Sequence, residues 1–125
     1  MAHKVIPMLR IFDYNKAIQF YINWLGFTLD WEDKPLNAPV YLQVSKQDIT
    51  LHLTEHHGDC TPGSKVFIIC TEGLREYHRE LLAKDYMYNK PGLELTPWNA
   101  LAFTVIDPFG NQLFFNEYLP ATATI

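Results

Sequence analysis

Hydrophobic and polar residues alternate along several short stretches of the chain, a period that predicts β-strands with one buried face. The clearest stretch is 49–55, where Thr50, His52 and Thr54 separate aliphatic residues. Apolar or alternating stretches of similar length predict further strands at 5–11, 27–31, 40–45, 66–70, 86–89, 100–106 and 111–117. The chain is therefore expected to be rich in short strands.

Two other stretches carry apolar residues at the spacing of an amphipathic helix. The first begins after Asp13, whose side chain can cap a helix, and ends before Gly26, a residue type that commonly follows one. The second is expected to begin at Thr71 or Glu72. Residues 56–64 are of loop-forming types throughout, so we expect a linker near the middle of the chain.

The same order of elements occurs on both sides of this linker. One shift along the chain carries the helical positions 14, 17, 18, 21 and 22 onto 74, 77, 78, 81 and 82, and a similar shift carries the strand 49–55 onto 111–117. A repeat of this length is typical of duplicated supersecondary structure. We therefore predict an α+β fold of two tandem βαβββ modules, at about residues 4–57 and 64–118, within a single domain spanning 1–125.

Composition and charge narrow the possible functions. Lys and Arg number 10 and Asp and Glu number 14, and the resulting net charge of −4 argues against a nucleic-acid partner. No stretch is long and apolar enough to span a membrane, and the N-terminus lacks the apolar core of a signal peptide. Cys60 and Cys70 match neither a zinc-binding nor a disulfide pattern. We therefore expect a cytoplasmic protein without a membrane partner.

Two segments carry recognisable motifs. The first runs from Asp13 to Leu25-Gly26-Phe27, and the second contains Thr96-Pro97-Trp98 and the turn at 107–111. Together they resemble the vicinal oxygen chelate superfamily, which includes glyoxalase I, extradiol dioxygenases and bleomycin-resistance proteins, and the second segment resembles the bleomycin-resistance branch. Asn99 departs from that branch, which usually has Gly there. The resemblance implies a half-open curved sheet around a cleft, as in the glyoxalase/bleomycin resistance/dihydroxybiphenyl dioxygenase-like fold.

The resemblance also indicates where a metal would bind. Metal-dependent members of the superfamily place His or Glu ligands at positions that fall on Ile6, His52, Lys65 and Phe114 in this chain. Only His52 can bind a divalent ion, because Ile and Phe have no lone pair to donate and Lys is protonated at neutral pH. Catalytic metal sites use about three protein ligands. We therefore expect no metal and no other cofactor.

Other catalytic machinery is not evident in the sequence. It contains neither a glycine-rich phosphate loop nor a Gly-x-Ser-x-Gly nucleophile elbow, and we assign no catalytic residue. Whether the protein is an enzyme stays open, but the residues at the metal-ligand positions favour a binding protein.

Aromatic residues are the strongest positive signal for binding. Trp31 and Trp98 match positions where bleomycin-resistance proteins place drug-stacking aromatic residues, and the acidic Glu32 and Asp33 would attract a cation. The remaining candidate ligand-binding residues lie on strands expected to line the cleft, namely His52, Phe67, Phe103 and Phe114.

These observations lead to one hypothesis and two alternatives. The hypothesis is a non-catalytic homodimer that resembles bleomycin-resistance proteins and sequesters a planar cationic glycopeptide-type antibiotic, such as a bleomycin-type drug, in a cleft at the dimer interface. One alternative is a metal-dependent lyase or oxidoreductase of the glyoxalase or dioxygenase type. The other is a protein that binds a different planar metabolite, since a fold does not determine its ligand.

Overall fold

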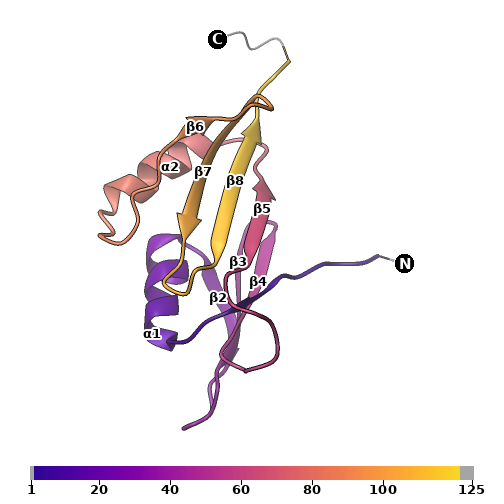
Figure 1. Ribbon diagram of the computed structural model, residues 1–125, viewed down its shortest axis with the longest axis vertical. Helices are drawn as coiled ribbons and strands as arrows, with labels where there is room; N and C mark the ends of the chain where they lie inside the picture. Colours follow the sequence, from indigo (N-terminus) through magenta and orange to yellow (C-terminus); the bar gives the residue numbers. More distant parts are fainter. Residues whose placement is uncertain (1, 122–125) are drawn as a thin grey trace. The chain divides into compact units, whose positions relative to one another are not determined.

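The computed structural model describes residues 2–121 (Figure 1). It contains two four-stranded sheets, each accompanied by one helical segment in the order βαβββ. The chain divides into two compact units, one reaching Ser64 and including residues 107–111, the other comprising residues 65–106 and the chain from Gln112 onwards. The predicted α+β class and the two βαβββ modules are confirmed.

Module one contains the first four strands, in the sheet order β1-β4-β3-β2. The pair β1–β4 is parallel and the other two pairs are antiparallel. The strands are β1 (Met8–Arg10), β2 (Thr28–Asp33), β3 (Tyr41–Lys46) and β4 (Ile49–Thr54).

The helix of module one begins as the sequence predicts but does not remain an α-helix. Asp13 caps α1 (Tyr14–Ala17) by accepting a 3.0 Å hydrogen bond from the backbone N–H of Lys16. The chain then continues as a π-helical segment, Ile18–Trp24. The wider turn accommodates the large side chains of this segment, which are buried at Phe20, Tyr21 and Trp24. A period of 3.6 residues alone does not reveal this change.

Module two repeats the topology, in the sheet order β5-β8-β7-β6 with β5 and β8 parallel. Its elements are β5 (Lys65–Ile69), α2 (Leu74–Ala83), β6 (Glu94–Leu95), β7 (Ala100–Ile106) and β8 (Gln112–Tyr118). The strand predicted at 86–89 is wrong. Asp85 has a φ of 53°, and a left-handed residue there turns the chain before any strand can form.

The second helix also begins later than the sequence predicts. Gly73 adopts a φ of 83° just before α2, a conformation that glycine tolerates without steric cost. The Glu117 side chain then accepts a 3.1 Å hydrogen bond from the backbone N–H of Leu74, the first residue of the helix. None of the described helices is long and apolar enough to cross a membrane.

Alternation along the strands gives each sheet a buried face and a more polar or exposed face, which we call the open face. In module one Leu42, Val44, Leu51 and Leu53 are fully buried, so the intervening residues form the open face. The open face of module one comprises Met8, Arg10, Asp30, Trp31, Tyr41, Gln43, Ser45, His52 and Thr54. The open face of module two comprises Lys65, Phe67, Ile69, Thr104, Phe114 and Asn116.

The turn at 107–111 has the chemistry that the sequence predicts. The Asp107 side chain accepts hydrogen bonds from the backbone N–H groups of Phe109 at 2.9 Å and Asn111 at 2.8 Å. Gly110 adopts a φ of 90°. Asn99 also has a left-handed φ of 60°, a conformation that Asn adopts more readily than most residues.

Candidate functional site

The open face of module one carries a row of residues that crosses three neighbouring strand pairs. Met8 on β1 pairs with His52 on β4, which pairs with Gln43 on β3, which in turn pairs with Trp31 on β2. The register of β2 shifts between Leu29 and Trp31, as at a β-bulge. A bulge brings consecutive side chains to one face, and Asp30 therefore lies on the open face together with Trp31.

Three rings gather in the middle of this face. The ring of Trp31 stacks on that of Tyr41, with centroids 5.9 Å apart and an interplanar angle of 5°. The imidazole of His52 meets both rings edge-on, at 5.4 Å from Trp31 and 5.2 Å from Tyr41. Trp31 is 45 % exposed, so the cluster presents an aromatic surface on which a flat molecule can stack.

A directed chain of hydrogen bonds holds the imidazole in this cluster. The Gln43 amide nitrogen donates to an Asp30 carboxylate oxygen at 3.0 Å, which turns the amide oxygen of Gln43 toward His52 Nε2, also at 3.0 Å. Nε2 must therefore carry the proton and donate it to Gln43. Nδ1 then accepts a 2.6 Å hydrogen bond from the Tyr41 hydroxyl. Both ring nitrogens of His52 are engaged.

The charges of this chain follow from its surroundings. Partial burial lowers the pKa of the His52 imidazole, so the ring is neutral at pH 7. Hydrogen bonds from Gln43 and Ser45 lower the pKa of Asp30, so this carboxylate is ionised. The open face of module one therefore combines an aromatic surface with one fixed negative charge.

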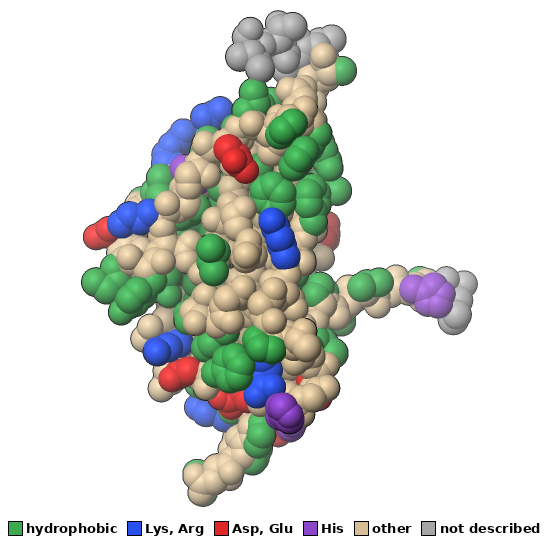
Figure 2. Space-filling model, viewed as in Figure 1, with side chains coloured by type: hydrophobic (Ala, Val, Ile, Leu, Met, Phe, Trp, Pro, Cys, Tyr) green, Lys and Arg blue, Asp and Glu red, His purple; other side chains and the backbone are tan. Residues whose placement is uncertain are grey.

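Module two has an apolar open face in the equivalent positions. Phe114 pairs with Phe67 as His52 pairs with Met8, and the two phenyl rings meet edge-on at 5.4 Å. Trp98 donates a 3.2 Å hydrogen bond from its indole nitrogen to Asn116 and lies edge-on to Phe114 at 6.2 Å. Figure 2 shows hydrophobic side chains gathered over β5 and β8.

Comparison with known proteins identifies the family. A family model described as "Glyoxalase superfamily protein" matches residues 1–121. The chain belongs to the glyoxalase superfamily. No protein with a curated description matches it in sequence.

Several solved structures show a similar fold. A bleomycin-binding protein in complex with bleomycin superposes with a TM-score of 0.70 at 19 % identity, over 94 % of this chain and 100 % of that one. A bleomycin resistance determinant encoded on the transposon Tn5 gives 0.73 at 19 % identity, over 95 % and 100 %. An antibiotic-binding protein from a Streptomyces species gives 0.68 at 21 % identity, over 95 % and 99 %. At these identities the likeness concerns the fold.

Four positions are those at which the resemblance implies metal ligands, and the residues there do not fit a metal ion. They are Ile6, His52, Lys65 and Phe114. His52 would have to break a hydrogen bond to free a lone pair, and Phe114 has none to offer. The Lys65 ammonium lies over the Phe114 ring, 5.0 Å from its centroid, and Ile6 is aliphatic. Within residues 2–121 no group of three or more His, Cys, Asp or Glu residues is arranged to hold a metal.

One predicted ligand-binding residue, Phe103, lies on the buried face of its sheet and not on the open face. Phe103 is fully buried, stacks on Phe115 with centroids 5.0 Å apart, and contacts Tyr77 of α2. The assignment of Phe103 to the ligand-facing surface is therefore wrong. The sequence already contained the signal, because the bulky residues Leu101, Phe103 and Val105 alternate with smaller ones and share the buried face.

The other predicted residues except Glu32 lie on the open faces or beside them, whereas Glu32 pairs with Leu42 and is directed to the opposite face of β2. Glu32 and Asp33 end β2 in exposed positions, and the Glu32 carboxylate accepts a 2.8 Å hydrogen bond from the Tyr14 hydroxyl. Asp30 and Tyr41 were missed by the sequence analysis. Their placement beside His52 depends on the bulge and on the pairing of β3 with β4, and local alternation reveals neither.

Proposed function

We propose that this glyoxalase superfamily protein is a non-catalytic cytoplasmic binding protein that sequesters a planar cationic antibiotic of the glycopeptide type, such as bleomycin. The observation that carries the proposal is the stacked Trp31–Tyr41 pair with the edge of His52 against it, half exposed on the open face of module one. Flat heteroaromatic groups stack on such a surface, and cations are attracted to the faces of its rings.

Negative charge beside the rings supports a cationic ligand. Asp30 is ionised on the open face, and Asp33, which pairs with Tyr41, adds a carboxylate to the same face at the exposed end of β2. The chain as a whole carries a net charge of −4. Charges of one sign raise the local concentration of an oppositely charged ligand and speed its association.

The hydrogen-bonding state of His52 supports binding rather than catalysis. A general base needs a free lone pair, and the Nδ1 lone pair of His52 accepts the hydroxyl proton of Tyr41. Its remaining ring nitrogen donates to Gln43. The imidazole is thereby held as a fixed edge in the aromatic cluster, which is a suitable role for a wall of a binding site.

The exposed apolar face of module two supports the homodimer that the proposal includes. Phe67 is 50 % exposed, Ile69 60 % and Trp98 48 %. Contiguous apolar surface of this kind commonly marks an interaction site. We propose that a second copy of the chain covers this surface and completes the binding cleft. Sedimentation should then give about twice the chain mass of 14.6 kDa, and a monomer at every concentration would contradict the dimer.

Tryptophan fluorescence provides the direct test of the binding site. Bleomycin should quench the emission saturably. Trp31→Ala and Trp98→Ala should each weaken the binding of bleomycin by about 1–3 kcal/mol, the range typical of aromatic hot-spot residues. Trp24→Phe is the matched control. The Trp24 side chain is only 2 % exposed and cannot stack on a ligand, so this substitution should leave the affinity for bleomycin unchanged. No saturable quenching by bleomycin, together with a rise in melting temperature caused by another planar metabolite, would favour that metabolite as the ligand.

A further inference from the structure

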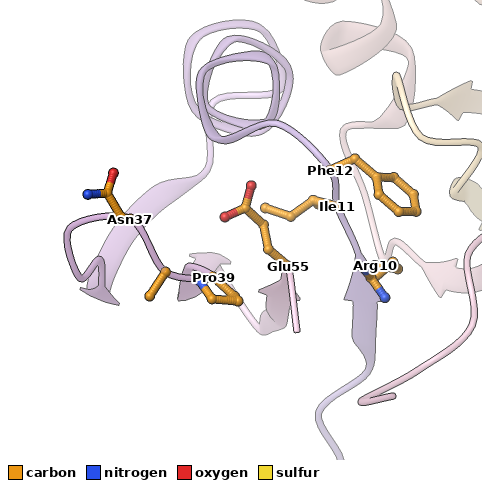
Figure 3. Close-up of a pocket in the computed structure, with 7 residues that line it drawn as sticks. Arg10, Ile11, Phe12, Asn37, Pro39 and Glu55 are labelled. Carbon is orange, nitrogen blue, oxygen red and sulfur yellow. The ribbon is translucent and has the colours of Figure 1, made fainter. Parts of the chain in front are cut away.

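Module one contains a second candidate site, on the side of β4 away from the aromatic cluster. An open pocket of about 420 Å³ lies between the segment that connects β1 to α1 and the loop that precedes β3 (Figure 3). Its lining residues are Arg10, Ile11, Phe12, Asn37, Ala38, Pro39 and Glu55. Glu55 follows the last residue of β4, and alternation directs its side chain to the opposite face from His52.

Glu55 is held firmly, but only one of its carboxylate oxygens is bonded. Its backbone N–H donates to the Val40 carbonyl at 2.9 Å, and its Oε1 accepts from the Val40 N–H at 2.9 Å. The second carboxylate oxygen has no hydrogen-bond partner among residues 2–121. Figure 3 shows the carboxylate pointing into the pocket, between Pro39 and Ile11. The site therefore presents a fixed acceptor with free lone pairs.

No cation of the described chain neutralises this carboxylate. Arg10 lines the pocket, but its guanidinium lies 4.7 Å from the centroid of the Phe12 ring, and Figure 3 shows the Phe12 side chain directed away from Glu55. Lys34, in the loop that forms one wall, lies over the Tyr14 ring at 3.8 Å. Within residues 2–121, Glu55 forms no salt bridge.

The wall opposite Ile11 is a preformed loop. Pro35 and Pro39 restrict the backbone on both sides of Asn37, which adopts a left-handed φ of 59°. Ala38 and Pro39 present apolar surface beside the carboxylate. Because the loop is shaped in advance, a ligand would lose little free energy in ordering it.

We infer that this pocket binds a primary alkylammonium group. The ammonium would donate a charge-assisted hydrogen bond to the free Glu55 oxygen, while its alkyl stem packs on Pro39, Ala38 and Ile11. A single, partly exposed ion pair contributes little free energy, so binding should be weak. The site is separate from the proposed antibiotic site, because Glu55 is directed to the opposite face of β4 from His52 and the pocket shares no residue with the cluster of Trp31, Tyr41 and His52.

Amide-resolved NMR tests the inference with n-butylammonium as the probe. Saturable shifts are expected at Asn37, Ala38, Val40 and Glu55, and n-butanol should cause none of them. Nα-acetyl-lysine N-methylamide, added in a parallel titration, shows whether a lysine side chain binds as well as a free amine does. Shifts with butanol equal to those with butylammonium would show apolar adsorption only and would overturn the inference.

Glu55→Gln is the decisive variant. It keeps the oxygen that accepts from Val40 but removes the charge, and it should weaken butylammonium binding several-fold. Glu72→Gln removes a charge from an exposed residue of module two and should leave binding unchanged. Asn37→Asp tolerates the same left-handed backbone and adds a charge at the edge of the pocket, so it should tighten binding several-fold. Unchanged affinity in both Glu55→Gln and Asn37→Asp would refute the site.

Discussion

The hydroxyl of Tyr21 donates a 2.7 Å hydrogen bond to Asp107 Oδ2, joining residues 86 positions apart in the chain. Tyr21 is fully buried in the π-helical segment, and Asp107 begins the turn between β7 and β8. The same Asp107 oxygen accepts from the Asn111 side chain at 2.8 Å, and that side chain also donates to the Arg10 carbonyl at 2.8 Å. One buried carboxylate thus connects this turn to the helix and to β1 within the first compact unit.

Removal of the Tyr21 hydroxyl should destabilise the protein. Tyr21→Phe keeps the ring but deletes a hydrogen bond to a buried carboxylate, and we expect a loss of about 1–3 kcal/mol in the free energy of unfolding. Urea denaturation measures this loss. Tyr88→Phe, at a residue 74 % exposed, is the control and should change stability by less than about 0.5 kcal/mol. Equal stability of both variants would show that the Tyr21–Asp107 bond contributes nothing.

Alkaline pH should destabilise the fold through two tyrosines. Burial raises the pKa of Tyr21 well above 10.0, with the Asp107 carboxylate adding to the effect, and burial likewise raises the pKa of Tyr77. In the folded protein each of these tyrosines keeps a proton that it releases near pH 10 in the unfolded chain. Their contribution to the free energy of unfolding is therefore complete below pH 10 and decreases as the pH rises above it. Ultraviolet titration should show these tyrosines ionising only on unfolding, and early ionisation of all tyrosines would contradict the prediction.

Acid pH should also destabilise the fold, through His52. Burial lowers the pKa of this imidazole below 6.5, so the unfolded state takes up a proton first as pH falls. The contribution of His52 to stability is therefore complete above pH 6.5 and decreases below it. NMR titration of the imidazole should show a midpoint below pH 6.5. A His52 midpoint at or above pH 6.5 would contradict the hydrogen-bonded neutral ring.

Binding of a cationic drug should depend on salt and on the acidic end of β2. Charges separated by more than about 10 Å are largely screened at 0.1 M salt, so added salt should weaken binding of bleomycin. Asp33→Asn should also raise the dissociation constant, whereas Asp48→Asn, in the exposed turn between β3 and β4, should change it less. Isothermal titration measures both effects. An affinity independent of salt would indicate that stacking alone drives binding.

Metal ions should neither bind stoichiometrically nor support the fold. Phe114 and Ile6 offer no donor atom and His52 uses both ring nitrogens, so added Ni²⁺ or Zn²⁺ should leave the melting temperature unchanged, as should a chelator. Thermal melts and elemental analysis check this. One ion bound per chain and lost in His52→Ala would instead favour the metal-dependent enzyme.

Local patterns in the sequence were sufficient to predict the modules. Alternation in 49–55 and its repetition in 111–117 reflect one buried and one open face, a property that each strand carries independently of its neighbours. The turn at Asp107 was predictable for the same reason, since its side chain bonds to backbone groups only two and four residues away. His52 and Trp31 were identified singly, as residue types suited to binding.

The tertiary structure alone decided how those residues meet. Tyr41 and Asp30 join His52 through strand register and a bulge, and a change of register by one residue would have placed these side chains on the opposite face. The π-helical segment depends on how Phe20 and Tyr21 pack, and the free carboxylate oxygen of Glu55 depends on the Val40 amide reaching the other one. Such pairings join segments distant in the chain, and periodicity within a single segment carries no information about them.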